Sequence, residues 1–145
     1  MQTETSIEID RPIEQVFDLT KNHVAEWSTI VVEDEIIEDK NGDVGTRFRV
    51  VTEERGQRME FDGIVTSYDP PNSASSRLVG LQFDIDVVYL FEDLGGRTKV
   101  TQVSEVTGKG FTKIMLALTG WMMKKSSCKA QYNELEGLKA FVEAS

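Results

Sequence analysis

The side chains best suited to nucleophilic catalysis occur once each in this sequence. His23 is the only histidine and Cys128 the only cysteine among 145 residues, so a Ser-His-Asp or Cys-His arrangement would have to use them. His23 stands in KNHVAEW with no nucleophile nearby in sequence. We therefore expect His23 to face solvent or cap a helix, and Cys128 to be a small packing residue. A single cysteine also excludes an intrachain disulfide and a cysteine-based zinc site.

The stretch DKNGD at residues 39–43 superficially resembles a calcium-binding loop. That loop requires Gly at its sixth position and Glu at its twelfth, whereas here Gly42 is fourth and Val50 is twelfth. Asn41-Gly42 is instead a strong hairpin signal, because both residues accept a positive φ. We predict a hairpin at this point and no metal site in the chain.

Three polar residues are predicted to point into the interior by the alternation of side chains along their strands: Tyr89, Gln102 and Ser104. Tyr89 shares a strand face with Phe83, and on the last strand Gln102 and Ser104 alternate with outward-facing residues. Buried polar groups need partners, which a ligand or a trapped water could supply. The alternative is a register shifted by one residue, in which Val103 points inward.

The elements that must position these residues follow a simple order. A strand at 3–10 precedes a helix at 11–20, which starts at Pro12 and carries Ile13, Val16, Phe17 and Thr20 on one face. A short helical piece covers 21–27. Period-two patterns then predict six strands joined by tight turns, at 28–40, 44–54, 55–69, 75–80, 81–93 and 98–107. Helical spacing predicts one long helix from about 110 to 144, bent near Gly120.

The first half of that helix is apolar on every side. Between Lys113 and Lys124 no charged residue occurs, and Thr119 is the only polar side chain. The apolar run is about ten residues, too short for a membrane span of roughly 20. A buried core helix, a partner surface and a cavity wall remain as explanations.

The charge distribution limits the partners. The formal net charge is -9, so we expect no binding to nucleic acid. Residues 108–145 nevertheless carry six lysines against three glutamates. Those lysines leave a helix on a membrane surface as a weak alternative, and we do not expect a membrane partner. Residues 1–10 show no secretory signal, which with the single cysteine favours the cytoplasm.

Several stretches together carry a family resemblance: SIEIDRPIEQVFDLT at the start, YDPPNS, GGRTKVTQ, and LEGLKAFVEAS at the end. The chain resembles the START-like superfamily over its whole length, and within it the polyketide cyclase/dehydrase (SRPBCC) family. The resemblance implies an α+β helix-grip fold in one domain, residues 1–145. A curved seven-stranded antiparallel sheet would wrap the long C-terminal helix, with two short helices after the first strand.

The resemblance further implies a hydrophobic cavity between sheet and helix, in a family that binds lipids, sterols, polyketides or hormones. Strand alternation and the apolar helix then predict its lining, with methionines suited to variable ligand shapes. The predicted lining residues are Phe48, Val50, Met59, Phe61, Val65, Phe83, Ile85, Val87, Tyr89, Gln102, Ser104, Met115, Leu118 and Met122. The alternative is an interior filled by side chains that binds nothing.

Binding or carriage of a small hydrophobic molecule is the function we expect, without a cofactor. A cyclase, aromatase or dehydratase using the same cavity is the first alternative. It is weakened because the inward residues include no carboxylate or histidine that could act as acid or base. An interaction module that uses the apolar helix 111–123 is the second alternative.

Overall fold

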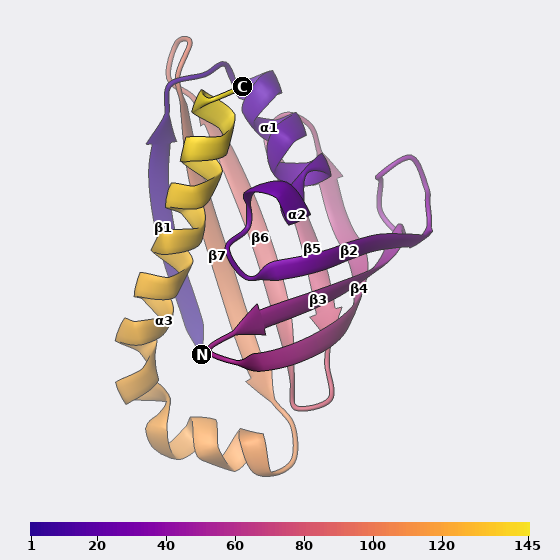
Figure 1. The fold of residues 1–145 in the computed structure, drawn as a ribbon, viewed down its shortest axis with the longest axis vertical. Helices are drawn as coiled ribbons and strands as arrows, with labels where there is room; N and C mark the ends of the chain where they lie inside the picture. Colours follow the sequence, from indigo (N-terminus) through magenta and orange to yellow (C-terminus); the bar gives the residue numbers. More distant parts are fainter.

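The computed structural model describes all of residues 1–145. The chain order is confirmed as predicted: one strand, two short helices, six strands and one long helix (Figure 1). The elements are β1 (Gln2–Ile9), α1 (Ile13–Asn22), α2 (Val24–Trp27), β2 (Val31–Glu38), β3 (Arg47–Glu54), β4 (Gln57–Asp69), β5 (Ser73–Val79), β6 (Phe83–Asp93), β7 (Thr98–Gly108) and α3 (Phe111–Glu143).

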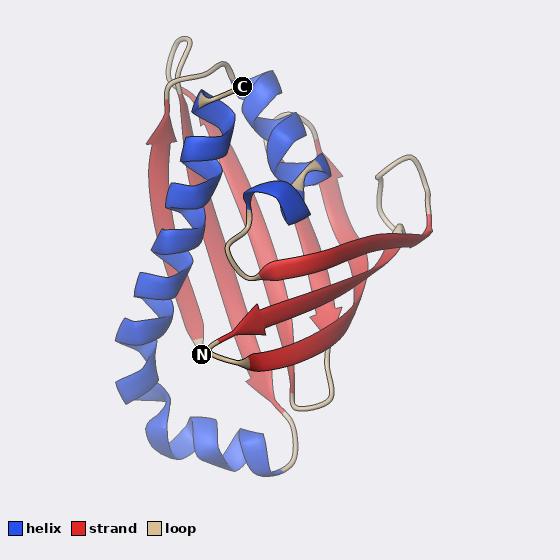
Figure 2. Ribbon diagram, viewed as in Figure 1, coloured by secondary structure: helices blue, strands red, loops and turns tan.

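All seven strands form one antiparallel sheet in the order β1-β7-β6-β5-β4-β3-β2. The six strands from β2 to β7 pair with their neighbours in sequence, and β1 adds to the far side of β7. The sheet is strongly curved, because β2 and β3 run across the direction of β6 and β7 (Figure 2). The helices lie on the concave side, which gives the predicted helix-grip fold.

Residues with positive φ occupy the connections from β2 to β3 and from β3 to β4. Asn41 (φ 59°) and Gly42 (φ 75°) lie between β2 and β3, and Arg55 (φ 52°) and Gly56 (φ 78°) join β3 to β4. Backbone in this left-handed region favours Gly and Asn. The predicted hairpin at Asn41-Gly42 is therefore confirmed.

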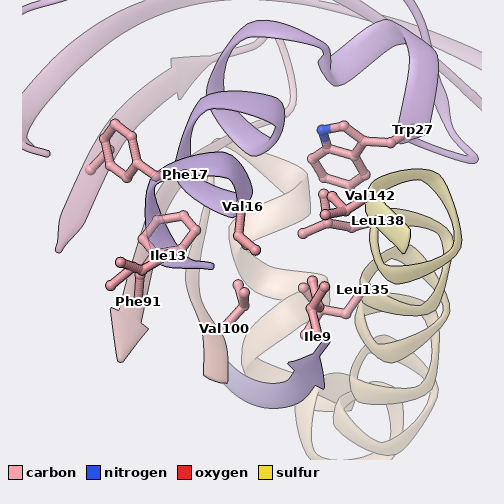
Figure 3. Close-up of a cluster of buried hydrophobic side chains, with 11 residues drawn as sticks. Ile9, Ile13, Val16, Phe17, Trp27, Phe91, Val100, Leu135, Leu138 and Val142 are labelled. Atoms are coloured by element: carbon pink, nitrogen blue, oxygen red, sulfur yellow. The ribbon is translucent and has the colours of Figure 1, made fainter. Parts of the chain in front are cut away.

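A hydrophobic core (Figure 3) packs at the end of the molecule where α1 lies beside the C-terminal half of α3 (Figure 1). Ile13, Val16 and Phe17 of α1 are buried, as the sequence predicted, and Trp27 of α2 donates its ring N–H to the carbonyl of Thr20 at 3.2 Å. Pro12 precedes the first helical residue instead of occupying it. The cluster comprises Ile9, Ile13, Val16, Phe17, Trp27, Ala74, Phe91, Val100, Leu135, Leu138 and Val142.

Helix α3 is continuous over 33 residues, and Figure 1 shows that it bends in its first half. Its buried residues are Gln131, Leu135, Leu138 and Val142, all in the second half. The first half contributes no buried side chain. No helix in the chain is both long enough and apolar enough to cross a membrane.

Candidate functional site

A cavity of about 1010 Å³ occupies the space between the concave face of the sheet and α3. It is lined by 43 residues, of which 21 are hydrophobic. Along α3 the lining residues lie between Thr112 and Glu134, whereas the core residues begin at Leu135. The interior is therefore divided along the helix into a hollow end and a filled end.

The sheet supplies the part of the lining that strand alternation predicted. Eleven of the fourteen predicted residues lie on the cavity wall: Phe48, Val50, Met59, Phe61, Val65, Phe83, Ile85, Val87, Tyr89, Gln102 and Ser104. Val103 does not line the cavity, so the structure has the unshifted register on β7. Gln102 lies opposite Tyr89, and Ser104 lies opposite Val87, in the pairing of β7 with β6.

The three predicted residues of α3 lie elsewhere, and this corrects the sequence prediction. Met115, Leu118 and Met122 are 44%, 69% and 62% exposed on the outer side of the helix. The cavity is lined instead by Leu116 and Met123, together with smaller residues of the same face. Because the first half of α3 is apolar all round, its sequence contains no polar side to show which face turns inward.

Phe48 lies against Gly63, which is its partner across the β3–β4 pair. A Cβ atom added at Gly63 would come within 2.3 Å of the Phe48 ring. The missing side chain thus makes room for the ring beside the cavity, as glycine does where another group must approach the strand closely.

A cluster of polar groups lies where the cavity meets the core. The Gln131 amide nitrogen donates to the backbone carbonyl of Gln102 and to the Ser104 hydroxyl, each at 3.2 Å. The carbonyl acceptor fixes the orientation of the Gln131 amide, since only its nitrogen can donate. The side-chain oxygens of Gln131 and Gln102 are buried and accept no hydrogen bond within the protein.

Glu134 is the carboxylate at this end of the cavity, and the loop after α2 already engages it. Its oxygens accept hydrogen bonds from the Thr29 backbone N–H at 2.6 Å and from the hydroxyls of Ser28 and Thr29. Burial, reinforced by the negative charge of Glu134, raises the pKa of the Tyr89 hydroxyl well above its ordinary value of 10.0. Tyr89 therefore remains protonated and can donate a hydrogen bond.

Lys21 and Asp34 lie on the cavity wall between α1 and β2. Desolvation lowers the pKa of Lys21 despite the opposing effect of Asp34, and desolvation raises the pKa of Asp34 despite Lys21. The Lys21 ammonium lies 5.3 Å from the centre of the Tyr68 ring, a favourable cation–π geometry. These two residues place an amine and a carboxyl group on the wall beside α1 and β2.

Four polar residues of the cavity wall were not predicted from the sequence: Gln131, Glu134, Lys21 and Asp34. Gln131 had a readable signal, because it is the one polar member of the stripe that continues through Leu135, Leu138 and Val142 at helical spacing. His23 and Cys128 are not part of the lining, and the His23 ring lies 2.9 Å from Glu26 instead. No group of three or more His, Cys, Asp or Glu side chains is arranged to hold a metal ion.

A family described as "Polyketide cyclase / dehydrase and lipid transport" matches residues 1–143. The chain belongs to this family. No individual curated protein matches it by sequence.

Solved structures show the same fold at low sequence identity. A START superfamily protein from Mycobacterium smegmatis has a TM-score of 0.82 at 18% identity, covering 99% of this chain and 97% of its own. A Thermus thermophilus protein has a TM-score of 0.82 at 19% identity, with coverage of 99% and 98%. The Zhui aromatase/cyclase from a Streptomyces species has a TM-score of 0.77 at 13% identity, with coverage of 99% and 93%. The predicted helix-grip fold is confirmed by these structures, and the predicted polyketide cyclase/dehydrase family is confirmed by the family match.

Proposed function

We propose that this protein binds one small, mostly apolar molecule in the cavity between the sheet and α3. The observation that carries the proposal is the hollow end of the interior. Inward-facing Phe83, Ile85 and Val87 are only half-buried, and all three line the cavity. A ligand that covers this apolar surface should gain about 25 cal/mol of binding free energy per Å². The cavity volume of about 1010 Å³ is at the upper end of the usual range for ligand sites.

The polar residues support a ligand with at least one polar group. The unpaired side-chain oxygens of Gln102 and Gln131 lack a donor, and Tyr89 carries a protonated hydroxyl. A ligand hydroxyl that donates to one of these oxygens should contribute about 0.5–1.5 kcal/mol to binding, the net value of a typical hydrogen bond. An apolar body with a hydroxyl or carbonyl group fits this wall better than a pure hydrocarbon.

Cyclase-type catalysis is the second candidate, and the likeness to an aromatase/cyclase favours it. The cavity offers Tyr89 as a hydrogen-bond donor. Its raised pKa makes it a weak acid, and Glu134 is occupied by the hydrogen bonds from Ser28 and Thr29. A catalytic acid or base works best with a pKa near the operating pH, so these groups support binding more than turnover.

A displacement assay with an apolar fluorescent probe tests the proposal. We expect micromolar binding to the wild type, and Leu116→Trp should weaken it about tenfold or more by filling the cavity. Leu118→Trp is the matched control, since it adds the same side chain to the outer face of the same helix. Probe binding that Leu116→Trp leaves unchanged, or that Leu118→Trp abolishes, would contradict binding in this cavity.

Native mass spectrometry of the purified protein provides the ligand class directly. An adduct that is absent from Leu116→Trp but present in Leu118→Trp would be the cavity ligand. Conversion of a candidate polyketide that Tyr89→Phe abolishes would favour the catalytic alternative over binding alone.

A further inference from the structure

The outer face of α3 is an unpartnered apolar surface. We use this name for Phe111, Ile114, Met115, Leu118, Trp121 and Met122, which are all exposed and follow one another at spacings of three or four residues. This stripe extends over about three turns of helix, and Trp121 within it is 78% exposed. Such a contiguous apolar surface on a monomer marks an interaction site.

The loop between β5 and β6 lies at the same end of the molecule as the start of α3 (Figure 2). Leu81 in the loop is 97% exposed. The loop is held beside the start of α3 by Lys109, whose backbone N–H donates to Gln82 and whose ammonium donates to Gly80, both at 2.9 Å. One end of the protein therefore presents an apolar helix face and one fully exposed leucine.

Lysines surround the outer face, and acidic residues are absent from it. Lys113, Lys124, Lys125 and Lys129 are exposed, none of them forms an ion pair, and no Asp or Glu occurs between Thr112 and Asn133. These four charges stand against -13 on the rest of the chain, from the total of -9. The electrostatic field of the molecule therefore orients this end toward an anionic partner.

We infer that the outer face of α3 docks on the surface of an anionic lipid bilayer. A helix with an apolar face, flanking lysines and an exposed tryptophan suits the boundary between headgroups and acyl chains. Docking would bury the apolar stripe while the lysines reach lipid phosphates and the acidic body faces away from the membrane. The inner face of the same turns, with Leu116 and Met123, lines the cavity.

Self-association through this face is disfavoured by the same charges. An antiparallel pairing of two copies of α3 would place Lys113 of one copy near Lys124 and Lys125 of the other, with no carboxylate in the contact to compensate.

Bilayer docking departs from the sequence-based expectation of no membrane partner. Leu118 and its neighbours, which were expected to line the cavity, are exposed instead. The inference holds for the empty protein and does not depend on the proposed ligand.

Vesicle flotation with the full chain tests the inference. We expect binding to phosphatidylcholine vesicles that contain phosphatidylserine, and little binding to phosphatidylcholine alone or at high salt. Trp121 is exposed and Trp27 is buried, so tryptophan emission should shift to shorter wavelength on binding in the wild type and not in Trp121→Phe. Absence of binding to the anionic vesicles would overturn the inference.

Matched substitutions identify the surface. Lys124→Gln combined with Lys125→Gln should weaken vesicle binding about 30-fold, from the usual contribution of each lysine near an anionic surface. Lys40→Gln combined with Lys99→Gln removes the same charge elsewhere and should leave binding largely unchanged. Likewise Leu118→Ser should release the protein, whereas Ile37→Ser, at a residue 60% exposed on β2, should not.

Two outcomes of these substitutions would overturn the inference. Equal losses in the test and control variants would show that binding is unspecific. A dimer in sedimentation equilibrium that Leu118→Ser dissociates would show that a second copy covers the outer face. Circular dichroism of each variant verifies that the fold is retained.

Discussion

Tyr89 reports the polarity of the cavity through its ionisation. The pKa of Tyr89 is raised in the folded protein above its ordinary value of 10.0, so between these two values the folded state holds the proton more tightly than the unfolded chain. The associated stability is complete below about pH 10 and is lost as pH rises toward the folded-state pKa. Alkaline conditions should therefore destabilise the protein through this residue.

Urea unfolding at about pH 9 and about pH 11 measures this effect. We expect the free energy of unfolding of the wild type to fall more steeply than that of Tyr89→Phe, by up to about 1.4 kcal/mol per pH unit above pH 10. Tyr132→Phe, at an exposed tyrosine of α3, is the control. Equal slopes for the wild type and Tyr89→Phe would show that the Tyr89 hydroxyl is hydrated.

At the same scale, strand residues of the site could be predicted and helix residues could not. A strand has two faces, so one correctly placed residue such as Phe61 fixes the direction of its neighbours. The positions of Lys21, Asp34 and Glu134 on the cavity wall could not be predicted, because a charged residue in a sequence normally indicates exposure to solvent. Their partners, such as Ser28 and Thr29 for Glu134, are distant in sequence.

Among the elements, α3 shows where sequence periodicity can predict which face of a helix is buried and where it cannot. Its second half alternates buried leucines with charged residues, and its buried face follows directly from that pattern. In the first half Leu116 and Leu118 are equally apolar, although the first lines the cavity and the second is exposed. Only the surrounding structure assigns them to different sides.

The two glycines of α3 provide a prediction at this scale. A Cβ atom at Gly120 would meet nothing within 4 Å, whereas one at Gly137 would lie 2.9 Å from the carbonyl oxygen of Trp27. Gly120→Ala should therefore stabilise the protein by about 1 kcal/mol, the usual helix-interior gain. Gly137→Ala should destabilise it, because α2 has to move away from α3. Thermal unfolding of both variants would show opposite shifts, and shifts of the same sign would contradict this packing.

For the whole molecule, the division of the interior into a hollow end and a filled end predicts that the two halves of α3 differ in local stability. The filled end packs Leu135, Leu138 and Val142 against α1 and the sheet, while the hollow end leaves the first half of α3 with few buried contacts. Segments with little burial open at low free-energy cost. Backbone amides at 112–127 should therefore exchange hydrogen faster than those at 135–142.

Hydrogen exchange followed by mass spectrometry measures both segments in one experiment. A cavity ligand should slow exchange at 112–127 and leave 135–142 nearly unchanged, because it adds contacts only at the hollow end. Uniform protection along α3 in the free protein would contradict a division of the interior.

The pairing of β1 with β7 limits how far the protein can fold while it is being synthesised on the ribosome. Ile9 pairs with Thr98, and Gln2 pairs with Glu105, so β1 has no partner in the sheet until β7 has been made. At about 5–20 residues per second, nearly a hundred residues separate the two strands by about 5–20 seconds of translation. The core residue Ile9 also needs Leu135 and Leu138 of α3. During that interval the nascent chain exposes the strand that should close the sheet, and the native fold forms only after α3 has been made.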